Sequence, residues 1–497
     1  MRKSCFLVLL LFVANSCMAQ GLSNMWLMGY QSWGGFPYET YKIDFKTGVP
    51  NVYLDSIGMN IAGATHANIT DTNGSLQFYS NGYYIANNAN DTMINGTGIN
   101  PSPYTTEQGN KTIGLNIPQA NLILPMPDHP NLYYLFHNTV DNFPYNSLAH
   151  FMYYSVIDMS LNNGLGEVVQ KNVVISTDTT NAGKITACKH GNGRDWWITW
   201  LGTGNNRIYK TQLTPYGVSA VTSQNIGSVR NFFIGQGRFS PDGTKYCFAH
   251  TNFVADAIID FYDFDRCTGM FSNAQTGVNY ESHCKNGGVE FSSNSQFAYI
   301  TNCDSIFQFD VTQPNIFVTK TLLAVWDSFI SFGFGTFFAY PELADDGKIY
   351  ITTGNSTMHL HVINNPDSPG LACNFVQHQL QLPGYYSNSL PNHPNYFLGD
   401  NGLCNNLSFE SLESWKVKKV TVFGNPTHDK FTLWFPPDKD VGVLEIYDVN
   451  GECIRRERVS QWSQYKTVDI GALSAGVYNC KMRWPDGEGA LRVVKLE

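Results

Sequence analysis

A turn-and-strand motif that recurs at nearly constant spacing is the feature of this sequence that most restricts its fold. The clearest copy is the turn Ser240–Gly243, followed by the apolar segment Lys245–Thr251. Asp242 in this turn, Asn294 and Asp346 are spaced 52 residues apart, and each precedes a short apolar segment. Gly, Asn, Asp and Pro suit such turns because they adopt positive φ or fix φ in advance. A period near fifty residues is typical of repeat proteins, so we expect a repeat architecture.

Two sequence patterns indicate the number of repeats. Turns of this kind precede short apolar segments at seven places, residues 71–74, 128–131, 193–195, 240–243, 294, 345–347 and 392–395. Segments that end in an apolar residue followed by a polar one, before a turn, finish at residues 44, 158, 212, 265, 310 and 364. The first interval in this second series is about twice the others, so we expect a degenerate copy near residues 87–96. Both series predict seven units of about four short strands, each one blade of a β-propeller.

A blade has two apolar faces, so neighbouring blades have to stack into a closed ring. We expect Gly21–Gly29 to supply the strand that completes the last blade near Tyr396–Leu398, which would cover the open sheet edge. Composition agrees with an all-β protein, because 14% of residues are aromatic, only 14% are charged and 44 are Gly. The alternative is a pair of β-sandwiches with turns spaced by chance.

The N-terminus has the features of a secretory signal peptide. A basic start (Arg2 and Lys3) precedes the apolar segment Phe6–Val13, and cleavage is expected between Ala19 and Gln20. The apolar segment is too short to span a membrane, and no other segment is long enough. A lipoprotein attached through Cys17 is the alternative. We therefore expect a secreted protein, extracellular or on the outer cell surface.

Nine cysteines remain once the signal peptide is removed. An exported protein can form disulfides, but the odd count leaves at least one thiol unpaired. Local proximity suggests the pairs Cys373–Cys404 and Cys453–Cys480.

The sequence pattern changes after the repeats. We expect a signal peptide in residues 1–19, a seven-bladed propeller in 20–404, a polar linker in 405–418 and a small β-sandwich in 419–497. The last region alternates apolar and polar residues over seven short segments separated by Gly, Pro and Asn-Gly turns, as in an antiparallel sandwich. These segments are 419–423, 430–435, 443–447, 452–458, 467–470, 476–481 and 491–495.

The C-terminal region also carries a set of landmarks in a fixed order. They are Gly424-Asn425-Pro426, His428–Leu433, Leu444–Gly451, Leu473–Tyr478 and Val493-Val494-Lys495. This series resembles the type A C-terminal sorting domain of the Bacteroidetes type IX secretion system, although Gly424 stands where that family usually has Pro. The resemblance implies recognition by the type IX secretion machinery and transport across the outer membrane. It assigns the sorting signal to Asn425, Pro426, Asn450, Gly451, Gly476, Tyr478 and Lys495.

The repeat region has landmarks of its own. They are Asn24-Met25-Trp26, Ile43-Asp44-Phe45, Asp71–Leu76, Tyr153–Met159, Phe239–Gly243 and Val362–Pro366. They are similar to WD40-like propellers of exported Bacteroidetes proteins, several of which are linked to adhesion or gliding. The resemblance implies a binding protein and brings no catalytic residue with it.

Signatures of chemistry are scarce. The chain has no H-E-x-x-H, no G-x-S-x-G and no phosphate-binding Gly loop. The net charge of −9 argues against nucleic-acid binding. His359 and His361 alternate on one strand and face the same side, as two metal ligands would, but we expect a solvent-facing or core-satisfied pair. We therefore expect no metal, no cofactor and no catalytic residue.

Clustered aromatic residues are the candidate binding residues. Loops near Gly or Pro carry Trp33, Phe36, Tyr38, Tyr83, Tyr84, Tyr385 and Tyr386. Exposed rings of this kind suit stacking on sugars or hot spots for a surface protein. The alternative is that they pack between blades. We expect a non-catalytic binding or adhesion module. An enzyme acting on polysaccharide is the second hypothesis, which carboxylates with raised pKa in the propeller channel would favour.

Overall fold

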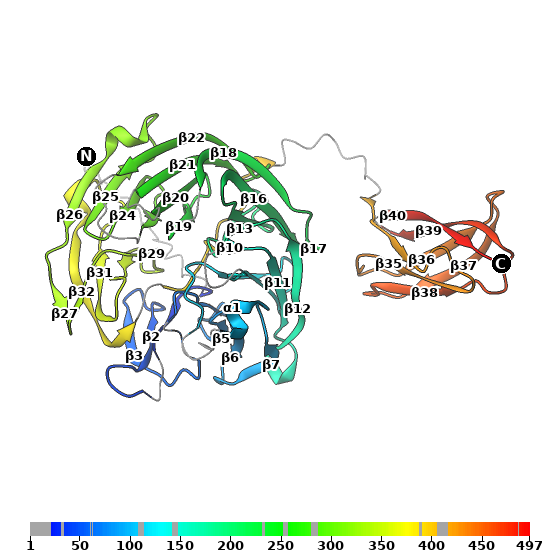
Figure 1. Ribbon diagram of the computed structural model, residues 1–497, viewed down its shortest axis with the longest axis horizontal. Helices are drawn as coiled ribbons and strands as arrows, with labels where there is room; N and C mark the ends of the chain where they lie inside the picture. Colours follow the sequence, from blue (N-terminus) through cyan, green and yellow to red (C-terminus); the bar gives the residue numbers. More distant parts are fainter. Residues whose placement is uncertain are drawn as a thin grey trace, which may run out of the picture. The chain divides into compact units, whose positions relative to one another are not determined.

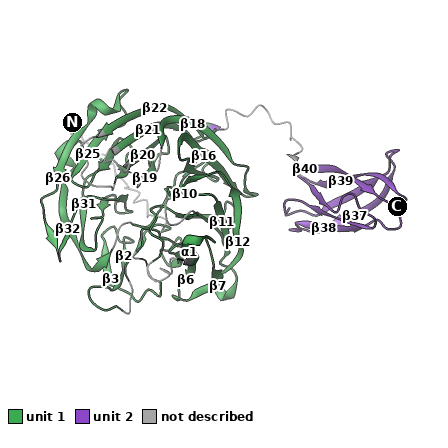
Figure 2. Ribbon diagram, in the orientation of Figure 1, with its two compact units in different colours: residues 1–403 green, residues 404–497 purple. Residues whose placement is uncertain are grey.

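The computed structural model describes residues 21–30, 34–59, 61, 63–107, 114–141, 148–230, 234–251, 257–279, 287–386, 390–404, 416–485 and 487–497 (Figure 1). The chain divides into two compact units, residues 1–403 and 404–497 (Figure 2). The signal peptide lies outside the described residues, as does most of the predicted linker. Within the described residues, no helix has the length and apolar character needed to cross a bilayer.

The larger unit consists of antiparallel blades arranged around a ring. In Figure 1, β19 and β29 lie toward the centre of the ring, whereas β22 and β32 lie at its rim. The described strands form seven blades. Blade 1 contains β1 (Met25–Gly29), β2 (Thr40–Asp44) and β3 (Asn51–Leu54). Blade 2 contains β4 (Ala67–Thr70), β5 (Leu76–Ser80), β6 (Tyr84–Asn87) and β7 (Thr92–Thr97). Blade 3 contains β8 (Asn121–Pro125), β9 (Leu132–His137), β11 (Met152–Asp158) and β12 (Glu167–Ser176).

The remaining four blades each have four main strands. Blade 4 contains β14 (Thr186–Lys189), β15 (Trp196–Leu201), β16 (Asn205–Thr214) and β18 (Thr222–Arg230). Blade 5 contains β19 (Ile234–Phe239), β20 (Lys245–Thr251), β21 (Ala257–Asp265) and β22 (Met270–Asn279). Blade 6 contains β23 (Gly288–Phe291), β24 (Phe297–Thr301), β25 (Ser305–Asp310) and β26 (Thr321–Val325). Blade 7 contains β29 (Pro341–Leu343), β30 (Ile349–Ile351), β31 (Thr357–Ile363) and β32 (Phe375–Tyr386).

Short elements complete this unit. They are β10 (Leu148–Ala149), β13 (Thr180–Asn181), β17 (Gly217–Val218), β27 (Ile330–Ser331), β28 (Phe334–Gly335), the α-helix α1 (Pro103–Glu107) and the 3-10 helices η1 (Asn162–Gly164), η2 (Ile316–Thr319) and η3 (Gly370–Cys373). A single parallel bridge between β7 and β12 joins blades 2 and 3 into one eight-stranded sheet.

The predicted seven-bladed, all-β fold is confirmed. The second sequence pattern marks the strand next to the outermost one in every blade, namely β2, β6, β11, β16, β21, β25 and β31. The degenerate copy expected near residues 87–96 is the end of β6 and its turn into β7. Six of the seven predicted turns lead into second strands, β5, β9, β15, β20, β24 and β30. The turn at residues 392–395 leads into no strand.

Side chains that alternate along β1 connect blade 1 to both of its neighbours. Trp26 packs on Tyr350 of β30, with ring centroids 5.7 Å apart. Met25 and Leu27 point the other way, into a cluster with Tyr79 of β5. Because successive residues of a strand face opposite sides, one strand fills both inter-blade spaces. These contacts place β1 at the level of second strands, so blade 1 has no inner strand of its own among the described residues.

The predicted ring closure is wrong. β1 pairs with β2, and residues 396–398 form no strand. Residues 390–401, called the channel segment below, instead run along the inner strands. The Asn392 amide donates to Asn121 O (2.9 Å) and Ile185 O (2.9 Å), and His393 Nε2 donates to Asn68 O (2.9 Å). Prolines at positions 391 and 394 lack the N–H that a ladder requires, so polar side chains hold this segment.

The smaller unit is a β-sandwich. Its five-stranded sheet has the order β33 (Lys416–Val417), β40 (Gly487–Lys495), β39 (Gly476–Trp484), β36 (Gly442–Tyr447), β37 (Cys453–Val459). Its three-stranded sheet has the order β34 (Thr421–Phe423), β35 (Lys430–Trp434), β38 (Tyr465–Asp469). Phe431, Leu433, Leu444, Ile446 and Trp484 are buried in one cluster between the sheets. All seven predicted segments form strands, and β33 adds a parallel pair with β40.

The cysteine pairs suggested by proximity are wrong. Cys373, Cys453 and Cys480 are free thiols, whereas Cys404 is disulfide-bonded, as are Cys267 and Cys303. Proximity in sequence failed because residues that are close along the chain can lie on different strands, with side chains that do not face each other.

Candidate functional site

An exposed aromatic surface lies where loops of blade 1 meet loops near blade 7. Phe36 and Tyr38 follow β1, and their exposed fractions are 66% and 45%. Phe332 and Phe334 belong to the hairpin of β27 and β28, with exposed fractions of 62% and 42%. The Tyr385 ring contacts three of them edge to face, with centroid distances of 5.6 Å to Tyr38, 5.9 Å to Phe332 and 6.3 Å to Phe334.

Backbone contacts hold these loops together. Tyr385 N donates to Pro37 O (2.7 Å), and Tyr38 N donates to Gly35 O (2.7 Å). At Gly384, an added Cβ would lie 3.1 Å from Pro37 O, which is closer than most Cβ contacts. The sequence therefore brings Tyr385 against the blade 1 loop through a glycine that allows close approach.

The β27–β28 hairpin presents an aromatic residue in an unusual backbone conformation. Its two central residues, Phe332 and Gly333, have φ of 47° and 89°. Asn, Asp or Gly usually occupy both positions of such a turn, because positive φ is costly for a bulky residue. The hairpin base is fixed by hydrogen bonds from Trp326 Nε1 to Thr336 Oγ1 (3.2 Å) and from Asn355 Nδ2 to Gly335 O (2.7 Å). A strained, exposed aromatic on a fixed support indicates a functional constraint rather than a folding one.

The aromatic surface lies on one face of the propeller. In an antiparallel blade, the loop between the second and third strands and the connection to the next blade emerge on the same face. The loop from β1 to β2 is of the first kind, and the segment from β26 to β29 is of the second. Turns between first and second strands emerge on the opposite face.

The other aromatic residues singled out in the sequence do not join this surface. Trp33 lies outside the described residues. Tyr83 is buried and Tyr84 half-buried, both on blade 2. Tyr386 is buried, and its Oη donates to His359 O (2.7 Å) and accepts from Thr353 N (2.8 Å). The burial of Tyr83 and Tyr386 does not agree with the stacking role predicted for them. Tyr386 instead packs between blades, which was the alternative expectation.

His361, the second residue of the predicted histidine pair, is fixed by hydrogen bonds to the backbone. His361 is buried, its Nε2 donates to Thr336 O (3.1 Å), and its Nδ1 accepts from His378 N (3.2 Å). Burial lowers the pKa of His361 to about 3, so the ring is neutral at physiological pH. His378 in turn contacts Asp327 (3.0 Å). Nowhere in the described part of the chain do three or more His, Cys, Asp or Glu side chains gather in a way that could hold a metal ion.

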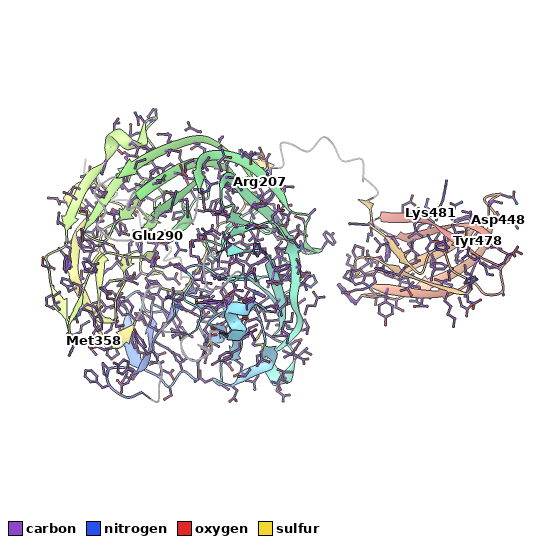
Figure 3. All side chains as sticks on the ribbon, viewed as in Figure 1. Arg207, Glu290, Met358, Asp448, Tyr478 and Lys481 are labelled. Atoms are coloured by element: carbon purple, nitrogen blue, oxygen red, sulfur yellow. The ribbon has the colours of Figure 1, made fainter. Side chains whose placement is uncertain are left out.

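A buried ion cluster occupies the propeller channel. Arg238 of β19 lies 3.3 Å from Glu290 of β23 (Nε to Oε2) and also forms an ion pair with Glu342 of β29. Figure 3 shows Glu290 near the centre of the ring. Arg238 Nη1 donates to His393 O (3.1 Å), which ties the cluster to the channel segment. Burial raises the pKa of Glu290, because loss of hydration outweighs the attraction of Arg238.

A cavity of about 170 Å³ adjoins this cluster. Its wall includes Arg238, Glu290 and Glu342, together with Asp345 from the turn between β29 and β30. Burial also raises the pKa of Asp345, although Ser23 Oγ donates to its Oδ1 (2.9 Å). Two carboxylates with raised pKa thus line the channel, but Glu290 shares its guanidinium partner with Glu342.

The predicted sorting residues converge at one end of the smaller unit. Asn425 Nδ2 donates to Arg492 O (3.0 Å) and its Oδ1 accepts from Val494 N (2.8 Å), so the first turn is fixed to the last strand. Gly476 pairs with Lys495, and Tyr478 Oη donates to Ser474 O (2.7 Å). Tyr447 pairs with Asn479, which brings the turn of Asn450 and Gly451, where Gly451 has φ of 83°, to the same end. Figure 3 labels Asp448 of this turn and Tyr478.

Comparison with known proteins identifies the export signal. Residues 421–494 match the family described as secretion system C-terminal sorting domain. This domain marks proteins that the type IX secretion system exports. The protein is therefore exported to the cell surface or beyond it, as the sequence analysis predicted. A sorting domain implies interaction with the type IX secretion machinery. A search of the curated proteins found no match.

Solved structures are similar to the larger unit only distantly. A putative 6-phosphogluconolactonase from Bacteroides fragilis is 12% identical, with 76% of this chain and 99% of that chain covered and a TM-score of 0.43. The periplasmic gluconolactonase of Pseudomonas aeruginosa is 12% identical, with 73% and 96% covered and a TM-score of 0.32. A quinoprotein alcohol dehydrogenase-like protein from Bacteroides thetaiotaomicron is 9% identical, with 73% and 75% covered and a TM-score of 0.35. Similarities of this size carry no conclusion about activity.

Sequence reasoning missed the channel cluster and the hairpin aromatics. A signal for the cluster was present, because Arg238, Glu290 and Glu342 each stand four residues before a recurring turn residue and are spaced 52 apart. A charged residue at the same place in three consecutive apolar strands predicts convergence on the axis. Phe332 carried a weaker signal, an aromatic followed by Gly between two short apolar segments.

Proposed function

We propose that the propeller is a non-catalytic binding module that recognises a glycan or a surface protein through its exposed aromatic surface. The observation that carries this proposal is the group of exposed rings at Phe36, Tyr38, Phe332 and Phe334, supported by the buried Tyr385. Three separate parts of the chain build it, and one of them holds Phe332 at positive φ.

The chemistry of the surface suits such partners. Aromatic rings offer a large, rigid contact area at low conformational cost, and they dominate binding energy at interfaces. Because the rings meet edge to face, their faces point in different directions. Such a surface suits a branched or pleated ligand better than a ligand that is a single flat ring. A contiguous group of exposed apolar side chains is a common mark of an interaction site.

The wider biological setting is part of the proposal. We infer an exported Bacteroidetes protein with WD40-like blades in residues 20–404 and a role in adhesion. A signal peptide ending at Ala19 would begin export, a linker at 405–418 would follow the propeller, and residues 419–497 would direct passage through the type IX system. The family match to residues 421–494 supports the last step.

The proposal is tested with the full chain on a glycan array and in pull-down from native cell envelopes. Replacing Phe332 and Phe334 together by Ala should weaken binding at least tenfold, since aromatic hot spots contribute about 2 kcal/mol or more. Tyr216→Ala is the matched control, because Tyr216 is equally exposed in a different turn. Equal loss in the control, or unchanged binding in the double variant, would contradict the assignment of the surface.

An enzyme acting on polysaccharide is the second candidate. The raised pKa values of Glu290 and Asp345 favour it, because a general acid has to be protonated near working pH. Glu290 and Glu342, however, bind one guanidinium, whereas glycosidase carboxylates flank the scissile bond. Turnover of any polysaccharide by the purified protein, lost in Asp345→Asn, would establish this alternative and displace the binding role.

A further inference from the structure

The outer face of the three-stranded sheet in the smaller unit carries exposed aromatic side chains. Leu433 of β35 and Val468 of β38 are buried in the core of the sandwich, so the residues next to them in each strand point away from it. Phe423 of β34, Trp434 of β35 and Tyr465 of β38 lie on this outer face. Their exposed fractions are 62%, 50% and 63%.

The strand register brings these rings together. Trp434 pairs directly with Tyr465 on one side and with Thr421 on the other. Phe423 lies diagonally across from Trp434, at a separation that aromatic side chains can bridge. The three rings therefore form a contiguous group across all three strands, and such groups mark interaction sites more reliably than single exposed apolar residues do.

The polar side chains of this face offer hydroxyl groups and no net charge. Thr432 and Thr467 have their Oγ1 atoms 3.0 Å apart, and this hydrogen bond uses one of the two hydroxyl hydrogens. The pair therefore keeps one donor and several acceptor lone pairs for a ligand. Within the three strands, Lys430 and Asp469 lie on this face and form an ion pair (3.4 Å), whereas Lys466 points to the other side. A neutral ligand that carries hydroxyl groups matches this chemistry.

The size of the face favours a narrow ligand. Strands lie about 4.8 Å apart and rise about 3.4 Å per residue, so three strands of about five residues cover roughly 14 Å by 17 Å, or about 240 Å². A stable protein interface buries about 800 Å² on each partner. A second copy of the chain or a folded partner protein therefore needs more surface than this face provides, whereas a few sugar rings fit within it.

We propose that this face binds a neutral polysaccharide chain, which is a site beyond the proposed function of the propeller. Sugar rings stack on Trp434 and Tyr465, Phe423 extends the same platform, and sugar hydroxyl groups bond to Thr432 and Thr467. Aromatic side chains supply this contact area at low conformational cost. The backbone ladder fixes their spacing, because all three rings stand on strands of one sheet.

Cosedimentation with insoluble polysaccharide tests this site. The full chain carrying Phe332→Ala and Phe334→Ala serves as the starting protein, so that the aromatic surface of the propeller contributes nothing. We expect it to bind at least one of cellulose, curdlan and mannan with a saturable isotherm. Binding should be equal at about 0.05 M and about 0.5 M NaCl, because the contacts are uncharged.

Substitutions in this starting protein locate the contact. Trp434→Ala and Tyr465→Ala should each weaken binding about tenfold or more, as loss of an aromatic hot spot does. Tyr216→Ala is the matched control, because the exposed fraction of Tyr216 is 65%, nearly that of Tyr465, and Tyr216 lies in the larger unit. If Trp434→Ala does not fold, Tyr465→Ala and the conservative Tyr465→Phe, which should keep most of the binding, still decide the matter.

Several results would overturn the inference. One is binding by the wild-type chain that the starting protein lacks, which would place the polysaccharide on the propeller and support the proposed function instead. Absence of binding to all three polysaccharides, or equal loss in Tyr216→Ala and Tyr465→Ala, would also overturn it. Oligomers that dissociate in Trp434→Ala would assign the face to a second copy. Reduced export of Trp434→Ala with unchanged polysaccharide binding would assign it to the secretion machinery.

Discussion

Replacing Arg238 by Met should destabilise the larger unit by about 3–5 kcal/mol at pH 7. The guanidinium is buried between two carboxylates, and removing one partner of a buried ion pair leaves an uncompensated charge. For a unit of about 380 residues, an unfolding entropy of roughly 0.8 kcal/mol/K converts this loss to about 4–6 °C in Tm. Scanning calorimetry of the full chain measures it, and the transition of the smaller unit serves as an internal reference.

The loss should depend on pH in a defined direction. Burial raises the pKa of Glu290 above its ordinary value of 4.5 in the folded protein. A carboxyl group with a raised folded pKa stabilises most below its unfolded pKa, and this contribution is lost as pH rises through the folded pKa. Without Arg238 the pKa of Glu290 rises further, so the Tm difference between variant and wild type should be smaller at pH 4 than at pH 7.

Two companion variants make this result decisive. Changing Glu290 and Glu342 to Gln together with Arg238→Met removes the unpaired charges and should recover most of the lost Tm. Arg194→Met, which removes half-exposed ion pairs with Asp128 (3.1 Å) and Asp195 (2.8 Å), should shift Tm by about 2 °C or less. The reasoning is refuted if Arg238→Met costs no more than Arg194→Met at pH 7, or if the triple variant is as unstable as the single one.

Three further predictions follow from packing, backbone conformation and exposure. Trp26→Ala should destabilise the larger unit by about 3–5 kcal/mol in calorimetry, because its buried ring packs on Phe45 (4.8 Å) and Tyr350; a loss below 1 kcal/mol would contradict its role between blades. Phe332→Gly should stabilise the protein by about 1 kcal/mol while weakening ligand binding, since Gly tolerates positive φ; a lower Tm would show that Phe332 serves folding. Iodoacetamide should label Cys453 first among the described free thiols, because the other four are buried, and early labelling of any of those on peptide mapping would disagree with the structure.

The repeat itself could be predicted from sequence because its signals are local. The Asp-Gly turn before β20 requires positive φ at Gly243, and the apolar residues that follow have to be buried. Both requirements act within a few residues, so they survive in degenerate copies. The seven strands of the smaller unit were readable for the same reason.

Ring closure and both candidate sites were decided by tertiary structure. The turn-like residues 392–395 meet local rules for a blade, yet hydrogen bonds of Asn392 and His393 to the inner strands place them in the channel. Tyr38 and Tyr385 meet only because blade 1 follows blade 7 around the ring. Of the predicted aromatic residues, the structure brings Tyr38 against Tyr385, with Phe36 exposed two residues before Tyr38, and leaves the other described ones elsewhere.

By itself, then, the sequence determined the repeat, the number of blades and the export signal at the end of the chain. Turn geometry and alternating burial depend on neighbouring residues, so they can be recognised locally. Tertiary structure decided which blades lie next to each other and which side chains lie between them. In the sequence, the three charged residues of the channel cluster are simply 52 positions apart: Arg238, Glu290 and Glu342. They form ion pairs only because the folded ring brings β19, β23 and β29 close together. Their low-dielectric surroundings, and therefore their chemistry, exist only once the ring excludes water from the channel.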